Sequence, residues 1–176
     1  MKTHPNLRPM RNLLWVLLLF IGGSSCRFKS SKEVEKKSAN PKIRNGIVVN
    51  PKGVEVEQAF LTYEDGNLVA DENKIKLNEK VKLHLVTHGW EPKDSLFFLS
   101  GSEIVETSEK DTLLNEKDLF KDFEKGLSQE QLESVTISVT ITQMTKLFDY
   151  FKVSFKMKDE VNPRHVVEGY YKLHLH

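Results

Sequence analysis

The 176-residue chain contains a single cysteine, Cys26, and this scarcity excludes two kinds of stabilising cross-link. An intramolecular disulfide needs two cysteines, and a zinc cluster built from thiolates needs more than one. Ten phenylalanines and four tyrosines supply apolar surface for a core, which argues against disorder along the whole chain. The length indicates one ordinary globular domain with tails, held together by packing and hydrogen bonds.

The chain also lacks the short signatures of common hydrolases and nucleotide-binding enzymes. It has no Gly-x-Ser-x-Gly elbow, no His-Glu-x-x-His motif and no phosphate-cradling glycine-rich loop. The acid pairs Asp71–Glu72 and Asp159–Glu160 lie among turn residues, where solvated side chains are the simplest interpretation. We therefore predict a protein that is not an enzyme, with no catalytic residues and no cofactor.

The net charge of +1 conceals three segments of different charge. Residues 1–25 carry three basic and no acidic groups, and residues 27–45 carry seven basic and two acidic groups. Residues 46–176 carry 16 basic and 23 acidic groups, which gives this segment a charge of −7. Because binding of nucleic acid needs clustered positive charge, we expect no nucleic-acid partner for the acidic segment.

The amino terminus has the basic, then apolar, then small-residue order of a secretory signal. Residues 13–21 form an uninterrupted apolar run, and the glycines and serines at 22–25 lead to Cys26. A membrane-spanning helix needs about 20 apolar residues, so this run is too short for a permanent span. The pattern fits a lipoprotein signal, an ordinary signal peptide with a chance cysteine, or a short amino-terminal anchor.

The segment Gly23-Ser24-Ser25-Cys26 resembles the lipobox of bacterial lipoproteins. The family usually has a large aliphatic residue at the position of Gly23. The resemblance implies cleavage before Cys26, attachment of diacylglycerol to its sulfur and acylation of the new amino terminus. Several acyl chains hold a protein stably at a membrane. Some bacterial lipoproteins carry an acidic patch straight after the cysteine that directs them to the cell surface. Here no acidic residue follows Cys26 until Glu33, so the resemblance implies an outer-membrane protein that faces the periplasm.

These patterns divide the chain into three parts. Residues 1–25 are the expected signal peptide, residues 26–45 the lipid anchor with a basic tether, and residues 46–176 the folded domain. The tether has few apolar residues and no helical or strand period, which is typical of a flexible linker. Its lysines could equally rest on anionic lipid head groups or serve as a solvated spacer.

The folded domain alternates apolar and polar residues with period two, which is typical of antiparallel strands with one face on a core. The alternation predicts strands at residues 46–50, 54–63, 81–87, 95–106, 135–142, 151–158 and 166–176. The phase slips near Gln58, which predicts a β-bulge there. Turn residues at 159–163 predict a hairpin between the last two strands.

A helical island interrupts these strands. Asn115 is its expected cap and Gly126 its expected end. Its apolar stripe is Leu119, Phe120 and Phe123. Ser128 and Gln131 then resemble the capping box of a second short helix that carries Leu132.

The pattern as a whole predicts a mainly β fold. We expect an antiparallel Greek-key two-sheet sandwich of immunoglobulin-like architecture, with one or two short helices near 116–134. A closed barrel like that of lipocalins is the alternative. Lipocalins usually carry Gly-x-Trp in the first strand, whereas Gly89 and Trp90 are adjacent and lie mid-chain, which counts against the barrel.

Two groups of residues are candidates for binding. His174 and His176 share a strand face, and His84 from another strand would complete a three-imidazole metal site. Exposed strand histidines are the simpler interpretation, so we assign no metal ligands. Trp90, in a loop after a strand, is either a binding anchor or a plug for one end of the core.

The domain resembles the small β-sandwich lipoproteins of Gram-negative bacteria, and this resemblance supplies no site residues. It implies a membrane-anchored, non-enzymatic interaction module for a protein or glycan partner. The alternative is a binder of a small apolar ligand or metal in a lipocalin-like barrel, and an enzyme comes third. A filled core favours the first, an enclosed cavity the second, and a cleft with facing carboxylates the third.

Overall fold

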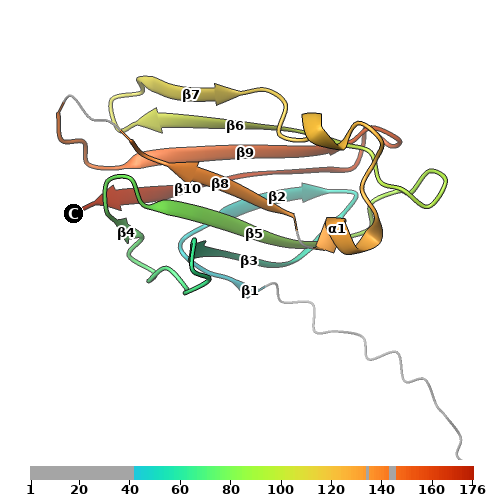
Figure 1. Ribbon diagram of the computed structural model, residues 1–176, viewed down its shortest axis with the longest axis horizontal. Coiled ribbons are helices and arrows are strands. Elements are labelled where there is room, and N and C mark those ends of the chain that lie inside the picture. The colour runs from blue at the N-terminus through green and yellow to red at the C-terminus, as the bar shows by residue number, and fades with distance from the viewer. Residues whose placement is uncertain (1–41, 134, 143–145) are drawn as a thin grey trace, which may run out of the picture. The chain divides into compact units, whose positions relative to one another are not determined.

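The computed structural model describes residues 42–133, 135–142 and 146–176 (Figure 1). In this part of the chain the elements are strands, one 3-10 turn η1 (Lys121–Phe123) and one helix α1 (Gln129–Glu133). Neither helical element is long and apolar enough to cross a membrane. The strands are β1 (Lys42–Ile43), β2 (Val48–Lys52), β3 (Glu55–Tyr63), β4 (Lys74–Ile75), β5 (Lys80–His88), β6 (Leu99–Thr107), β7 (Thr112–Glu116), β8 (Thr136–Thr140), β9 (Phe151–Asp159) and β10 (Val166–Leu175).

The strands form two separate sheets. The four-stranded sheet has the order β1-β3-β5-β8, and the six-stranded sheet has the order β2-β10-β9-β6-β7 with β4 also paired to β10. All pairs are antiparallel except β1 with β3 and β4 with β10. The predicted mainly β, two-sheet fold is confirmed, and the lipocalin-like barrel is wrong for the described residues because the strands close into no single sheet.

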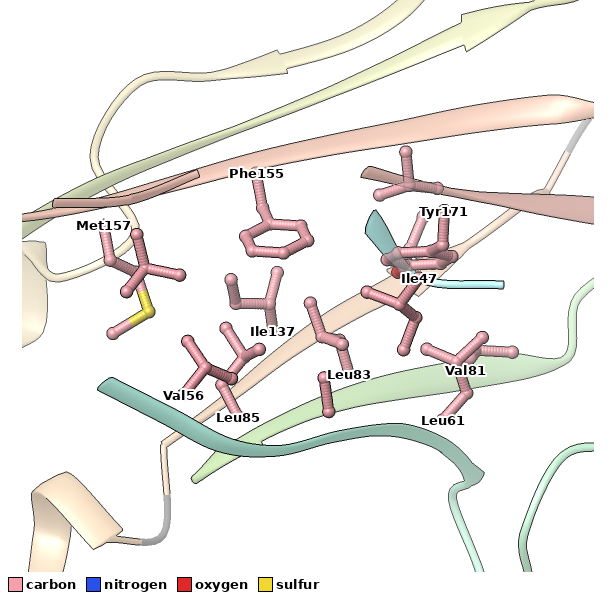
Figure 2. Packing of buried hydrophobic residues seen from close by; sticks show 14 of the residues in the cluster. Ile47, Val56, Leu61, Val81, Leu83, Leu85, Ile137, Phe155, Met157 and Tyr171 are labelled. Atoms are coloured by element: carbon pink, nitrogen blue, oxygen red, sulfur yellow. The ribbon is translucent and has the colours of Figure 1, made fainter. Parts of the chain in front are cut away.

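The core lies between the inner faces of the two sheets (Figure 2). Leu61, Leu83 and Ile137 come from the four-stranded sheet, and Phe155 and Met157 come from the six-stranded sheet. The central strands β5, β6 and β9 bury every second residue along their length, and in β9 the pattern begins at Phe151 and ends at Asp159. The period-two pattern in the sequence therefore sets which face of each strand points inward.

Two local predictions are confirmed in detail. The register of β3 against β5 shifts between Val56 and Gln58, which is the expected bulge. The bulge returns Ala59 and Leu61 to the buried face after Val56. At α1, the Ser128 N–H donates to Gln131 Oε1 at 2.9 Å and the Gln131 N–H donates to Ser128 Oγ at 3.3 Å, which is a reciprocal capping box.

The first helix of the predicted island is wrong. Asn115 lies in β7, paired with Ile104 of β6, and caps no helix. Between β7 and α1 the only helical element is the 3-10 turn η1, and Phe123 within it is 40% exposed. Phe120 alone of the stripe's aromatic residues is buried, above Gly101 of β6, where an added Cβ would lie 2.7 Å from the Phe120 ring. Pairing with β6 therefore overrides the local helical pattern.

Lys42 and Ile43, which the sequence assigns to the tether, pair in parallel with β3. The next residues tie this segment to the domain through Asn45, which is buried. Its amide donates to Val69 O at 3.0 Å, and its Oδ1 accepts the Leu61 N–H at 3.0 Å. Asn45 also has a φ of 58°, a conformation that asparagine tolerates better than most residues.

Candidate functional site

The predicted lipidation residue, Cys26, lies outside the described residues, together with the rest of the lipobox-like segment. The candidate sites within the described residues all belong to the folded domain.

The three histidines considered for metal binding are not brought together. His84 lies on β5 of the four-stranded sheet, whereas His174 lies on β10 of the six-stranded sheet. No group of three metal-binding side chains occurs in the described part of the chain. His84 instead stacks on Phe60, with ring centres 4.8 Å apart, and hydrogen-bonds Thr62 Oγ1 at 2.9 Å. Partial burial, and secondarily Lys82, lowers the pKa of His84.

Trp90 belongs to the core. Its side chain is buried in the hydrophobic cluster, and its indole Nε1 donates to Thr87 Oγ1 at 2.7 Å. Because both the ring and its polar atom are used within the fold, the core plug is the interpretation that the structure supports.

Asp159 corrects the expectation of a solvated turn residue, because its side chain is only 1% exposed. Its Oδ1 accepts the N–H groups of Val161 and Asn162, and its Oδ2 accepts the N–H group of Glu91. His165 lies beside it, with Nδ1 3.4 Å from Oδ2. Asp159 therefore organises the β9–β10 hairpin and joins it to the loop after β5, a structural role.

The outer face of the six-stranded sheet is basic, although the domain as a whole is acidic. The register of β2, β10, β9 and β6 places the outward residues of these strands on one surface. The ionisable Lys and Glu side chains on it are Lys52, Lys152, Lys156, Lys158, Lys172, Glu106 and Glu168. Five lysines against two glutamates give the outward residues of these four strands a charge of +3, and Glu160, just after β9, adds one carboxylate beside Lys158 at 3.9 Å.

A shallow hollow of about 330 Å³ lies on this basic face. The backbone of Gly169 and the short outward side chains of Ser102 and Ser154 line it. The ring of Tyr170 and the side chain of Ile104 supply apolar surface at its border. Asn50, Lys156 and Glu168 are its larger polar side chains. The hollow thus combines an aromatic ring with several hydrogen-bonding groups, which is the usual composition of a small-ligand site.

Charged neighbours hold the side chains around the hollow. Glu168 forms ion pairs with Lys52 at 3.4 Å and with Lys156 at 3.8 Å. The Lys152 ammonium lies 5.0 Å from the centre of the Tyr170 ring, within cation–π range. These contacts orient the aromatic ring and neutralise the carboxylate, so the uncompensated charge near the hollow is positive.

A second polar feature, which the sequence did not predict, lies inside the sandwich. Glu103 is only 2% exposed, on the inner face of β6, and its Oε1 has no hydrogen-bond partner. The hydroxyl of Tyr171, also buried, lacks a partner too. Burial, and secondarily the neighbouring Glu116, raises the pKa of Glu103 to about 7. Burial, with a smaller effect of Glu103, raises the pKa of Tyr171.

Glu103 could have been found only through the alternation of β6. The inward residues of this strand are Leu99, Gly101, Glu103, Val105 and Thr107. The sequence predicts a strand there, but a glutamate that is followed by isoleucine and valine is expected by default to face solvent. Its inward position can be predicted only when the alternation of inward and outward residues is followed from both ends of the strand.

Comparisons with known proteins add little. No family model matches the chain, and no curated protein matches its sequence. Among solved structures, the chain is similar to the C-terminal domain of Wzt, with 9% sequence identity and a TM-score of 0.47. The similarity covers 78% of this chain and 82% of that one.

Proposed function

We propose that this chain is an exported, lipid-anchored protein whose sandwich domain is a non-enzymatic binding module for a glycan that carries acidic groups. The observation that carries the proposal is the hollow over Gly169 on the outer face of the six-stranded sheet. We keep the Greek-key, immunoglobulin-like description of the domain as a prediction.

The chemistry of the hollow suits a sugar. Sugar rings present C–H groups on their faces and hydroxyl groups at their edges. The Tyr170 ring offers a flat apolar surface for the C–H groups. Asn50, Ser102 and Ser154 offer hydrogen-bond donors and acceptors for the hydroxyl groups. A shallow, open hollow also suits a polymer that lies across a surface better than a small molecule that must be enclosed.

The charge of the face favours acidic glycans over neutral ones. Five lysines surround or flank the hollow, and three glutamates oppose them: Glu106, Glu168 and, beside Lys158, Glu160. A positive surface attracts polyanions at long range, and this attraction weakens as salt screens it. Because the remainder of the domain is acidic, a polyanion would be directed to this face.

The test is binding of defined acidic and neutral oligosaccharides to the full chain, measured by calorimetry. Oligogalacturonates are the acidic probe and malto-oligosaccharides the neutral one. We expect saturable binding of the acidic probe, weakened as the salt concentration rises. Tyr170→Ala and Lys156→Ala should each lower its affinity at least about tenfold, which corresponds to roughly 1.4 kcal/mol.

Matched variants elsewhere on the domain serve as controls. Phe123→Ala removes another exposed aromatic ring, and Lys82→Ala removes a lysine from the outward face of the four-stranded sheet. Both should bind as the parent does. The proposal would be ruled out if no acidic oligosaccharide bound saturably, or if the Tyr170→Ala and Lys156→Ala variants bound the acidic probe as tightly as the parent does.

A further inference from the structure

A second cavity lies on the inner side of the sandwich, between the margins of the two sheets. Its volume is about 320 Å³, and it is lined by residues of β6 and β7, by the end of β8 and by the two residues that follow β8. β7 and β8 are the outermost strands of their sheets (Figure 1). We call this cavity the marginal cleft. Its volume falls within the range of small-molecule sites.

The wall of the marginal cleft is mainly aliphatic. Its apolar side chains are Val105, Leu113, Leu114, Val139 and Ile141. Val105 and Ile141 are buried, but Leu113 is 49% exposed and Leu114 is 40% exposed. Two neighbouring leucines that are half exposed beside a cavity offer apolar surface that a ligand could cover.

Two carboxylates adjoin this apolar wall. Glu103 is two residues before Val105 on β6, and Glu116 is two residues after Leu114 on β7. Because strands alternate faces, each glutamate shares the face of the lining residue, roughly 7 Å along the strand. Glu103 and Glu116 are also direct partners in the β6–β7 register.

Within the described residues, these two carboxylates are not paired with a cation. Across residues 42–133, 135–142 and 146–176, no ion pair joins Glu103 or Glu116 to a lysine, arginine or histidine. Oε1 of Glu103 is buried without any hydrogen-bond donor. An unpartnered buried carboxyl oxygen beside a second carboxylate is costly, and a donor that carries positive charge would relieve it.

We propose that the marginal cleft binds a small amphipathic cation, with its hydrocarbon body against Leu113 and Leu114 and its ammonium group between Glu103 and Glu116. The apolar wall selects the hydrocarbon, and the two carboxylates select the positive head group. The site lies on the inner face of the six-stranded sheet and is therefore independent of the glycan hollow on its outer face.

The probe is n-octylamine, whose chain is short enough to stay dissolved as single molecules. Calorimetric titration of the full chain at pH 8 should give saturable binding. n-Octanoate and n-octanol have the same hydrocarbon body with a negative or a neutral head group. We expect octanoate to bind at least about tenfold more weakly than octylamine, and octanol to fall between them.

Three variants locate the binding. Leu114→Lys places a bulky cation in the cleft and should abolish octylamine binding. Glu103→Gln should lower the affinity for octylamine at least about tenfold and leave the affinity for octanol unchanged. Leu68→Lys alters another exposed leucine outside the cleft and should bind as the parent does. Equal affinities for octylamine and octanoate, unchanged binding in Leu114→Lys, or equal losses in Leu114→Lys and Leu68→Lys would each overturn the proposal.

Discussion

At the scale of single residues, the most consequential side chain is Glu103, which the sequence does not single out. A carboxyl group that is 2% exposed stays protonated to higher pH than an exposed one, and its pKa is raised from 4.5 to about 7. Between these two values the unfolded chain has released this proton while the folded chain still holds it. The unfolded state therefore binds fewer protons, and this group lowers the free energy of unfolding as pH rises.

The Glu103→Gln variant tests this pH dependence. Near pH 4 both chains have a neutral side chain at this position, so their free energies of unfolding should be similar. Above pH 7 the parent bears a buried charge, and the variant should be more stable by up to about 3 kcal/mol. Denaturant titrations at pH 4, 6 and 8 measure the difference.

Glu106→Gln on the outward face of β6 is the matched control. It should give no gain in stability that grows with pH in this way. A Glu103→Gln chain whose advantage is the same at pH 4 and pH 8 would contradict the buried-charge explanation.

Buried polar residues also explain why the sequence predicts sites less well than strands. Asn45 satisfies backbone groups near residues 61 and 69, and Asn73 donates to Lys172 O, 99 positions away. Such partners depend on how distant strands come together, and no local pattern announces them. The same holds for the hollow, because Asn50, Ser102 and Glu168 meet only through the sheet register.

At the scale of elements, the predicted strands are mostly confirmed because most of them bury one face on the core. The strand predicted at residues 151–158 lies at Phe151–Asp159, and that predicted at 135–142 lies at Thr136–Thr140. β7 was missed, because an edge strand with exposed residues lacks the alternation that reveals the others. The short β1 and β4 were missed for a related reason, since two residues carry no periodicity.

Gly169 of β10 shows how closely neighbouring strands approach at one point. An added Cβ there would lie 2.2 Å from Val48 O of β2 and 2.7 Å from the Phe155 ring of β9. Gly169→Ala should therefore displace β2 or Phe155 and lower the free energy of unfolding by about 2 kcal/mol or more. Thermal and denaturant unfolding of the full chain measure this loss.

Gly66 provides the comparison for that substitution. Its φ is +87°, and an added Cβ would meet nothing within 4 Å. Gly66→Ala therefore reports the backbone cost alone, about 1 kcal/mol. If Gly169→Ala proves no more destabilising than Gly66→Ala, the close approach of β2 and Phe155 does not constrain this position.

At the scale of the whole molecule, the glycan proposal depends on an uneven distribution of charge. Residues 46–176 carry −7, yet the outward residues of β2, β10, β9 and β6 carry +3. The remaining surface is therefore strongly acidic. Such a distribution orients the domain toward a polyanion and repels that polyanion from its other faces.

The proposed anchor is the remaining whole-molecule prediction. The basic, apolar and small-residue order before Cys26 is typical of a cleaved signal, and the residue expected to carry lipid is this cysteine. Metabolic labelling with a fatty acid in a Gram-negative host should label the parent chain and place it in the membrane fraction. Cys26→Ala should lose both the label and the stable membrane association, because several acyl chains are needed to hold the chain at a membrane.

The Gly23→Leu variant separates the lipobox from a chance cysteine. It supplies the large aliphatic residue that lipoproteins usually carry three positions before the cysteine, so it should be labelled at least as fully as the parent. It should also accumulate less uncleaved precursor. A parent chain without label, or equal label in Cys26→Ala, would remove the anchor and leave a domain whose hollow and cleft must reach their ligands without a membrane.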